Sequence, residues 1–162
     1  MLMRPMRKAN RQKDAAWALD VFDRAPYITV SMTRPDGSPY GLPLSLARAD
    51  EKTFYFHCAG EGEKLDCLKA NPQVSLSAVS RCTPKYEEEK QNFTEYYHSA
   101  IASGKAEIVT GAEEKTEALR LICRRFLPGY MEHFGEAIRR SLDRTTIVRI
   151  SLIDPPVGKC KP

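Results

Sequence analysis

The sequence predicts a mainly β protein of the α+β class, built as a six-stranded antiparallel barrel with peripheral helices. Six segments are rich in alternating apolar or β-branched residues, and only short polar turns separate the first three. A doubly wound α/β sheet would need helices between most of its strands, so the pattern argues against that class. The length of 162 residues suits one domain, 1–162, with its own hydrophobic core.

Each predicted strand has its own signature. Apolar residues alternate most clearly in the second and fourth strands. Pro43 in the second strand predicts an edge, a bulge or a place where the ladder opens, and Gly104 in the fifth predicts a bend or bulge. The polar segment 81–94 predicts an exposed loop. The strands are expected at 27–33, 40–46, 53–58, 74–79, 97–109 and 145–153.

Helices are expected on either side of these strands. Apolar residues at helical spacing, with Asn10 as the N-cap, predict an N-terminal helical region over about 1–25. A second helical region, 110–143, is an insertion before the last strand, and Thr110 with Glu113 matches a capping box at its start. The expected helices cover 11–24, 61–70, the residues from the capping box to 126, and 130–142.

Composition narrows the class of protein. Hydrophobic residues make up 42% of the chain and charged residues 28%, and no apolar run is long enough to span a bilayer. The basic N-terminal segment lacks an apolar signal core, so we expect a cytoplasmic protein. The net charge of +4 comes from basic residues interleaved with acidic ones, which does not indicate nucleic-acid or membrane binding.

The cysteines and histidines do not form a metal-binding pattern. The chain has five cysteines, an odd number, and no two of them have C-x-x-C spacing. The three histidines, at 57, 98 and 133, lack H-x-x-x-H spacing. We therefore expect reduced thiols, without a disulfide framework or a metal site.

The most informative segment is 53–68, where an aromatic strand runs into a loop with glycines and then into a short helix. Lys64 lies in the first turn of that helix. Peptide N–H groups at a helix start, together with one ammonium group, form a small anion site that suits a phosphate-bearing ligand. The alternative is an ordinary strand–turn–helix unit with a solvated lysine.

Five motifs in a fixed order carry a family resemblance. They are Asp36-Gly-Ser-Pro-Tyr40 with Pro43-Leu-Ser45, Phe54-Tyr-Phe-His57-Cys-Ala-Gly-Glu-Gly62-Glu-Lys64, Asn71-Pro72-Gln-Val74, Tyr97-His-Ser99-Ala-Ile101-Ala-Ser-Gly104-Lys-Ala106, and Gly158-Lys159. With these motifs the chain resembles the FMN-binding split-barrel family related to pyridoxamine 5′-phosphate oxidase, nearest its nitroimidazole-resistance (NimA-like) branch. The resemblance implies a split barrel and a homodimer with FMN in clefts between the subunits.

The resemblance also implies roles for individual residues. Pro43, Leu44 and Ser45 would lie beside the isoalloxazine, and Ala59, Gly62 and Lys64 would hold the 5′-phosphate. Ser99 and Ile101 would contact the cofactor from the fifth strand, and His57 would lie near the phosphate or the flavin rim as the candidate catalytic proton donor. Relatives often have arginine at the position of His98. The histidine of this chain therefore lacks the fixed positive charge that those relatives have there.

By the same resemblance, the function is that of an FMN-dependent oxidoreductase acting on a small molecule, with nitroaromatic compounds such as 5-nitroimidazoles as the substrates of this branch. Pyridoxamine phosphate oxidation is less favoured, because basic residues for a second phosphate are not evident. Two alternatives stay open. One is a non-catalytic flavin- or haem-binding protein for storage or sensing, and the other is a barrel that acts only through protein contacts.

Overall fold

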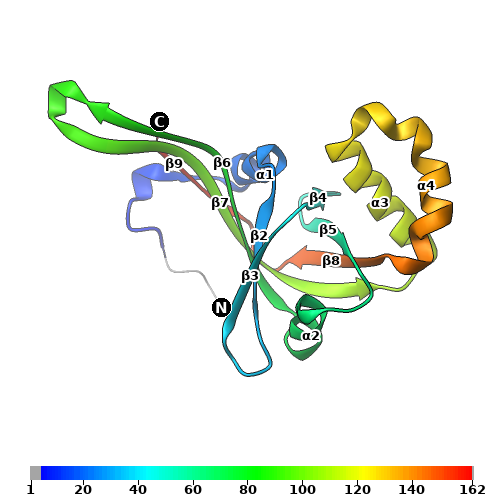
Figure 1. The fold of residues 1–162 in the computed structure, drawn as a ribbon. Coiled ribbons are helices and arrows are strands. Elements are labelled where there is room, and N and C mark those ends of the chain that lie inside the picture. Colours follow the sequence, from blue (N-terminus) through cyan, green and yellow to red (C-terminus); the bar gives the residue numbers. More distant parts are fainter. Residues whose placement is uncertain (1–4, 162) are drawn as a thin grey trace.

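The computed structural model describes residues 5–161, so residues 1–4 of the predicted N-terminal region and residue 162 lie outside it. Nine strands form one antiparallel sheet in the order β3-β2-β6-β7-β8-β5-β4, and β9 pairs with β7 and β1 (Figure 1). The six predicted strands are all present, and the mainly β, antiparallel architecture is confirmed. The strands are β1 (Gln12–Lys13), β2 (Ile28–Thr33), β3 (Pro39–Leu44), β4 (Ala47–Arg48), β5 (Thr53–Cys58), β6 (Gln73–Glu87), β7 (Asn92–Val109), β8 (Thr146–Leu152) and β9 (Val157–Lys161).

The sheet curls on itself through the segment that joins β3 to β4. β3 pairs with β2 at one end of the sheet order, whereas β4 pairs with β5 at the other end. Only Ser45 and Leu46 separate the two strands, and neither ladder includes these residues. We call this interruption, Ser45 with Leu46, the split. Pro43 lies in the edge strand β3, which is one of the positions that its missing N–H predicts.

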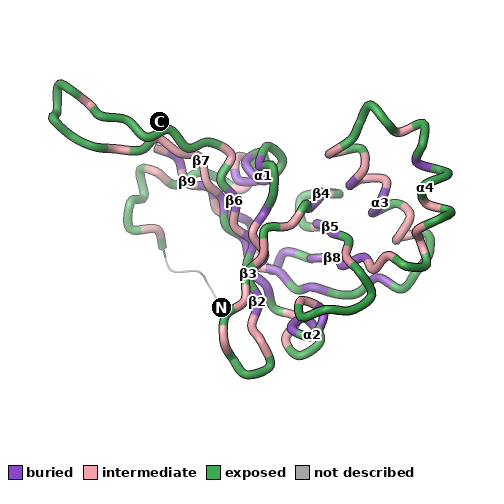
Figure 2. The backbone as a smooth tube through the Cα atoms, viewed as in Figure 1, coloured by how far each residue is buried: buried purple, intermediate pink, exposed green. Residues whose placement is uncertain are grey.

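The main core lies between the curled sheet and α1 (Ala15–Arg24), as the buried segments in Figure 2 show. Phe22 of α1 meets Phe54 of β5 edge to face, with ring centroids 5.5 Å apart. Trp17 packs on β9 at Gly158, where a Cβ atom would lie 2.3 Å from its Cε3 atom. The glycine therefore allows the close approach of α1 to the sheet.

The remaining helices flank the sheet. Along the chain, α2 follows β5, and α3 and α4 come between β7 and β8. A smaller hydrophobic cluster joins α3 and α4 to the sheet (Figure 1). No helix in the described part of the chain is long and apolar enough to cross a membrane. The helical elements are η1 (Ala9–Arg11), α1, α2 (Glu63–Ala70), η2 (Glu88–Lys90), α3 (Ala112–Phe126), η3 (Pro128–His133), α4 (Phe134–Ser141) and η4 (Leu142–Arg144).

The segment 81–94 is a two-stranded β-ribbon with a short helical turn at its tip. It is mostly exposed, as predicted, but the prediction that it forms a loop was wrong. β6 and β7 pair as far as Glu87 opposite Asn92, and the ribbon projects from the rest of the sheet (Figure 1). Tyr86 and Phe93 face each other across it with ring centroids 4.8 Å apart. Such aromatic cross-strand pairs stabilise a ribbon, but the acidic run at its tip dominated the sequence pattern.

Two predicted helix starts also differ from the structure. α1 begins at Ala15, and the side chain of Asp14 accepts the hydrogen bond of the Trp17 N–H at 2.9 Å. Asn10 is therefore not the N-cap, because η1 and β1 occupy the residues before Asp14. The capping box is absent as well: the N-cap of α3 is Gly111, which has no side chain to accept a hydrogen bond.

The predicted irregularity of the long hairpin lies in the other strand. The register of β6 against β7 shifts between Val79 and Arg81, so the bulge is in β6. Gly104 instead marks a close approach, since a Cβ atom there would lie 2.6 Å from Cγ2 of Ile150. The sequence located the crowded position but assigned it the wrong backbone feature.

Candidate functional site

The loop after β5 enters α2 through a glycine that the backbone requires. Ala59, Gly60, Glu61 and Gly62 are all exposed. Gly62 is the N-cap of α2 with φ +132°, and no atom lies within 4 Å of the position a Cβ atom would take. Conformation and not crowding therefore demands glycine here. The first peptide N–H groups of α2 point out of its N-terminal end into this open loop.

Lys64 supplies the positive charge of this loop. It is half-buried, and no described residue forms an ion pair or side-chain hydrogen bond with it. Its charge reaches the end of β5: burial raises the pKa of the Cys58 thiol, and the nearby Lys64 ammonium opposes that rise. Lys64 is therefore close enough to the strand end for its charge to act there, and it has no described partner that would compete with an anionic ligand.

Glu63, beside Lys64, is neutralised by a residue from the β2–β3 turn. The Nε atom of Arg34 donates to Oε1 of Glu63 at 2.6 Å, and its Nη1 atom donates to the carbonyl oxygen of Pro39 at 2.7 Å. The guanidinium also lies 4.7 Å from the centre of the Tyr40 ring. These contacts hold Arg34 in place and engage a carboxylate that would otherwise oppose anion binding.

The split lies level with the end of β5. β4 pairs with β5 through Ala47 opposite Tyr55, and continuing that register would bring Ser45 opposite His57. The ladder stops before that point, so the backbone of Ser45 is outside both ladders. Pro43 and Ser45 are exposed, whereas Leu44 is half-buried and packs against the core. The register thus places Ser45 level with His57, whereas the start of α2 is joined through Arg34 to Pro39, at the other end of β3.

Ser99 and Ile101 lie on the outer face of the sheet, where Ile101 is opposite Ser77, Ser77 is opposite Thr29 and Thr29 is opposite Pro43. They line a hollow of about 310 Å³ on the outside of β2, β6 and β7. Ile101, Val79 and Tyr27 are 45%, 53% and 56% exposed there. The Ser99 hydroxyl donates to the carbonyl oxygen of Lys159 at 3.5 Å.

In the chain these two residues are remote from the β5–α2 loop. His57 pairs with Ile147, which pairs with Val109, so the strand end that carries the loop is eight residues along β7 from Ile101. At the rise of an extended strand this is about 26 Å. The predicted site residues therefore form two groups. The loop group is His57, Ala59, Gly62 and Lys64. The sheet-face group is Ser99 and Ile101, and Pro43 lies in the same row of the sheet as Ile101, through Thr29 and Ser77. Leu44 and Ser45 follow Pro43 into the split.

His98 does not replace the missing arginine on the sheet face. Its ring packs edge to face on Trp17, with centroids 5.2 Å apart. Positive charge near the sheet-face group comes instead from Arg11, whose Nη1 donates to the Tyr97 hydroxyl at 3.4 Å, and from Lys159, 5.6 Å from the Tyr97 ring centre. Burial raises the pKa of Tyr97, but these two cations outweigh it and leave the pKa lowered.

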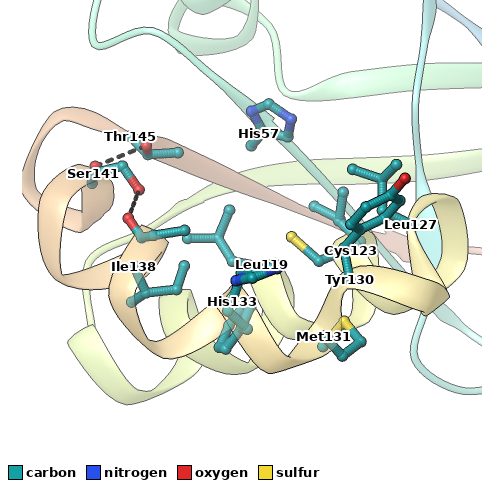
Figure 3. Close-up of a pocket in the computed structure, with 13 residues that line it drawn as sticks. His57, Leu119, Cys123, Leu127, Tyr130, Met131, His133, Ile138, Ser141 and Thr145 are labelled. Atoms are coloured by element: carbon teal, nitrogen blue, oxygen red, sulfur yellow. Dashed lines mark hydrogen bonds between the residues drawn. The ribbon is translucent and has the colours of Figure 1, made fainter.

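An apolar cavity of about 410 Å³ adjoins the loop group at His57. It lies between the end of β5 and the helices α3, η3 and α4, with His57 on one side and Leu119 and Cys123 on the other (Figure 3). The sequence analysis missed this cavity and missed Arg34. The apolar stripe of α3 was visible in the sequence, but a stripe does not tell whether neighbouring side chains fill the space beside it.

No group of three or more possible metal ligands occurs among the residues that the structure describes. The described cysteines are all free thiols.

Comparison with known proteins assigns the family. Residues 14–154 match the family described as pyridoxamine 5′-phosphate oxidase, and the chain belongs to that family. A comparison with curated protein sequences finds no match. The resemblance drawn from the five motifs is thus confirmed at the level of the family.

Solved structures share the fold. A putative 5-nitroimidazole antibiotic resistance protein from Bacteroides thetaiotaomicron has 21% identity and a TM-score of 0.75, over 92% of this chain and 88% of that one. The flavocytochrome Anf3 from Azotobacter vinelandii has 19% identity and a TM-score of 0.80, over 98% and 73%. A FAD- and haem-binding protein from Mycobacterium smegmatis has 22% identity and a TM-score of 0.75, over 93% and 73%. At these identities the likeness establishes a common fold.

Proposed function

We propose that the protein binds FMN at the interface of a homodimer and acts as an FMN-dependent oxidoreductase. The observation that carries the proposal is the loop group: a glycine-opened helix start and the free Lys64, which follow the end of β5. This donor set fits a phosphate, because the loop offers peptide N–H groups and one ammonium that no described carboxylate engages.

The separation of the two groups of residues supports the homodimer. Ser99 and Ile101 lie about 26 Å along the sheet from the loop, too far to join one cofactor site within a protomer. The sheet-face group also lies among exposed apolar side chains, including Tyr27 and Val79. A second copy seated on this face would cover those side chains and bring Ser99 and Ile101 to the partner's loop group.

The flavin, when bound, supplies the hydride or electron chemistry of the reaction. The chain's own residues bind and orient it. Lys64 and the first turn of α2 would hold the phosphate, and the backbone of Ser45, outside both ladders, with that of the neighbouring Leu44 at the end of β3, would bond the polar edge of the ring. His57 lies level with Ser45 and is exposed, so it can hold a proton at the rim of the site.

Nitroaromatic compounds are the substrate class that we propose for this activity. The support is the fold shared with a protein named for 5-nitroimidazole resistance and the motifs common to that branch. We also propose a cytoplasmic location. Its support is the five free thiols, a state that suits a reducing compartment.

A non-catalytic flavin- or haem-binding protein is the second candidate. It is favoured by the apolar cavity beside His57 and by structural neighbours named as a flavocytochrome and a FAD- and haem-binding protein. An imidazole at the edge of an apolar cavity is a common haem ligand. A flavin spectrum without a Soret band, together with turnover of a nitroimidazole by the reduced protein, would reject this candidate.

The test of the proposal is FMN titration of the purified protein and of two lysine variants. Lys64→Ala should weaken binding by about 1–3 kcal/mol, the scale of a hydrogen bond to a charged group. Lys69→Ala is the matched control, since this lysine is exposed at the other end of α2 and its loss should leave the affinity unchanged. Equal affinities for both variants would remove Lys64 from the phosphate site, and a monomer indifferent to FMN would refute the proposal.

A further inference from the structure

Most of the lining of the cavity beside His57 comes from elements that the flavin proposal does not use. α3, η3 and α4 provide most of its lining, and the end of β5 closes the opposite side (Figure 3). Its volume of about 410 Å³ lies within the range of small-molecule sites. The lining is predominantly apolar, with Leu119, Ile122, Phe134 and Ile138 among its members.

The rim of the cavity is more exposed than a packed helix pair requires. Leu127 and Tyr130, where α3 gives way to η3, are 56% and 65% exposed. Covering large apolar side chains at the mouth of an apolar cavity with a ligand removes apolar surface from water, which favours binding. The floor is closed, because Leu119, Ile122 and Phe134 are buried. The space is therefore suited to a compact guest that enters between these two rim residues and His57.

One end of the cavity is polar, and its hydrogen-bonding capacity is specific. The Ser141 hydroxyl donates to the carbonyl oxygen of Ala137 at 2.8 Å, and the Thr145 hydroxyl donates to the carbonyl oxygen of Ser141 at 2.9 Å. Both hydroxyl hydrogens are thus committed to the backbone, as Figure 3 shows. The oxygens retain lone pairs, so this end accepts hydrogen bonds from a guest.

From this arrangement we propose that the cavity binds a neutral aromatic molecule that carries one hydroxyl or ring N–H group. The rings lie against the α3 side chains, and the donor points to the oxygens of Ser141 and Thr145. A carboxylate is disfavoured at this end because neither hydroxyl has a hydrogen left to donate to it, and the other donors of the lining, His57, His133 and Tyr130, lie apart from it (Figure 3). A cation is disfavoured because no carboxylate lines the cavity and apolar burial would strip its water. The site does not depend on flavin binding.

The probe is 2-naphthol, with naphthalene as the partner that lacks the donor and 2-naphthoate as the charged one. Binding is measured by fluorescence and by chemical-shift changes in the full chain, with and without FMN. We expect a dissociation constant on the order of 10–100 μM for 2-naphthol. Naphthalene should bind about three- to tenfold more weakly, and 2-naphthoate should not compete.

Two variant pairs locate the site. Ala137→Trp fills the cavity and should abolish binding, whereas Ala112→Trp adds the same bulk at an exposed α3 position outside the cavity lining. Ser141→Ala removes an acceptor and should cost 2-naphthol about three- to tenfold in affinity, with no effect on naphthalene. Ser151→Ala, at an exposed position on β8, is its control.

The results separate this proposal from the flavin proposal. Binding of 2-naphthol that survives the absence of FMN and is lost in Ala137→Trp alone supports the cavity site, even if FMN does not bind. Absence of 2-naphthol binding below 1 mM, or equal binding by the two tryptophan variants, overturns it. If Ala137→Trp fails to fold, the Ser141→Ala pair decides: an unchanged 2-naphthol affinity overturns the assignment. A haem competition provides one further outcome. If added haemin gives a Soret band and 2-naphthol does not displace the haem, haem is the occupant of the cavity and the proposal is overturned.

Discussion

Arg125 joins three parts of the chain that the sequence leaves far apart. From α3, its Nη1 atom donates to the carbonyl oxygen of Leu46 at 2.6 Å. Its Nη2 atom donates to the carbonyl oxygens of Phe22, Asp23 and Ala25 at 2.7, 3.1 and 2.9 Å. The last carbonyls of a helix have no partner within it, so this one guanidinium caps the C-terminal end of α1 and fixes the chain at the split.

The cost of losing this side chain follows from these contacts. A hydrogen bond to a charged donor contributes about 1.5–3 kcal/mol, and four bonds summed would set an upper limit. Arg125 is only half-buried, and water can reach some of the carbonyls after truncation. We therefore expect Arg125→Ala to lower the free energy of unfolding by about 2–4 kcal/mol. For a chain of this size the melting temperature should fall by about 5–15 °C.

Urea denaturation followed by circular dichroism measures this effect. Arg124→Ala is the matched control, because Arg124 is exposed and forms no side-chain hydrogen bond to the described residues, so its loss should change stability by less than about 0.5 kcal/mol. Arg125→Lys keeps the charge but loses the fork of donors, and should fall between the two. If Arg125→Ala and Arg124→Ala unfold at the same urea concentration, the carbonyls are satisfied by other means and the reasoning is wrong.

Two further predictions concern packing and pH. Gly158→Ala should destabilise the protein by about 1–3 kcal/mol in denaturant titrations, because the new methyl group would overlap the Trp17 ring, whereas Gly135→Ala, with open space around it, should not. Hydrogen bonds from Tyr96 above all, and from neighbouring groups, lower the pKa of Glu87 from 4.5 to about 2 in the folded ribbon. The stabilisation from this carboxylate is complete above pH 4.5 and is lost as the pH falls toward 2. The protection factors of the amides at the ribbon tip, which compare each exchange rate with its intrinsic rate at the same pH, should therefore fall over that window and stay constant between pH 5 and 8.

The strands were predictable because their patterns are local. Alternating apolar residues and short turns define β2, β3, β5 and β8 almost to the residue. The ribbon of 81–94 was not predictable in this way, because its strands carry charged residues on both faces and bury little. Its strands pair because the β6–β7 ladder of the main sheet continues past the bulge in β6 into the ribbon. This extension depends on the whole β6–β7 pair, so a short stretch of sequence from the ribbon does not predict it.

The candidate site was predictable only in part, for a similar reason. The glycine and lysine of the β5–α2 loop form a contiguous motif, and the positive φ of Gly62 is a direct consequence of that local sequence. The level placement of Ser45 and His57 depends on the β4–β5 register, which no local pattern specifies. The cavity beside His57 depends on how tightly α3 and α4 pack, and this is decided by side-chain shape across elements that are separate in sequence.

The anion-binding capacity of the loop depends on a residue outside its motif. The loop and the first turn of α2 carry Glu61, Glu63 and Asp66 but only one lysine, so their summed charge is negative. Arg34, fixed by the Pro39 carbonyl and the Tyr40 ring, engages Glu63 and leaves Lys64 and the helix N–H groups less opposed. For the phosphate site that we propose, we therefore expect the affinity to be set jointly by α2 and the β2–β3 turn. A loop with the same glycines and lysine but without this arginine would be a much poorer cradle.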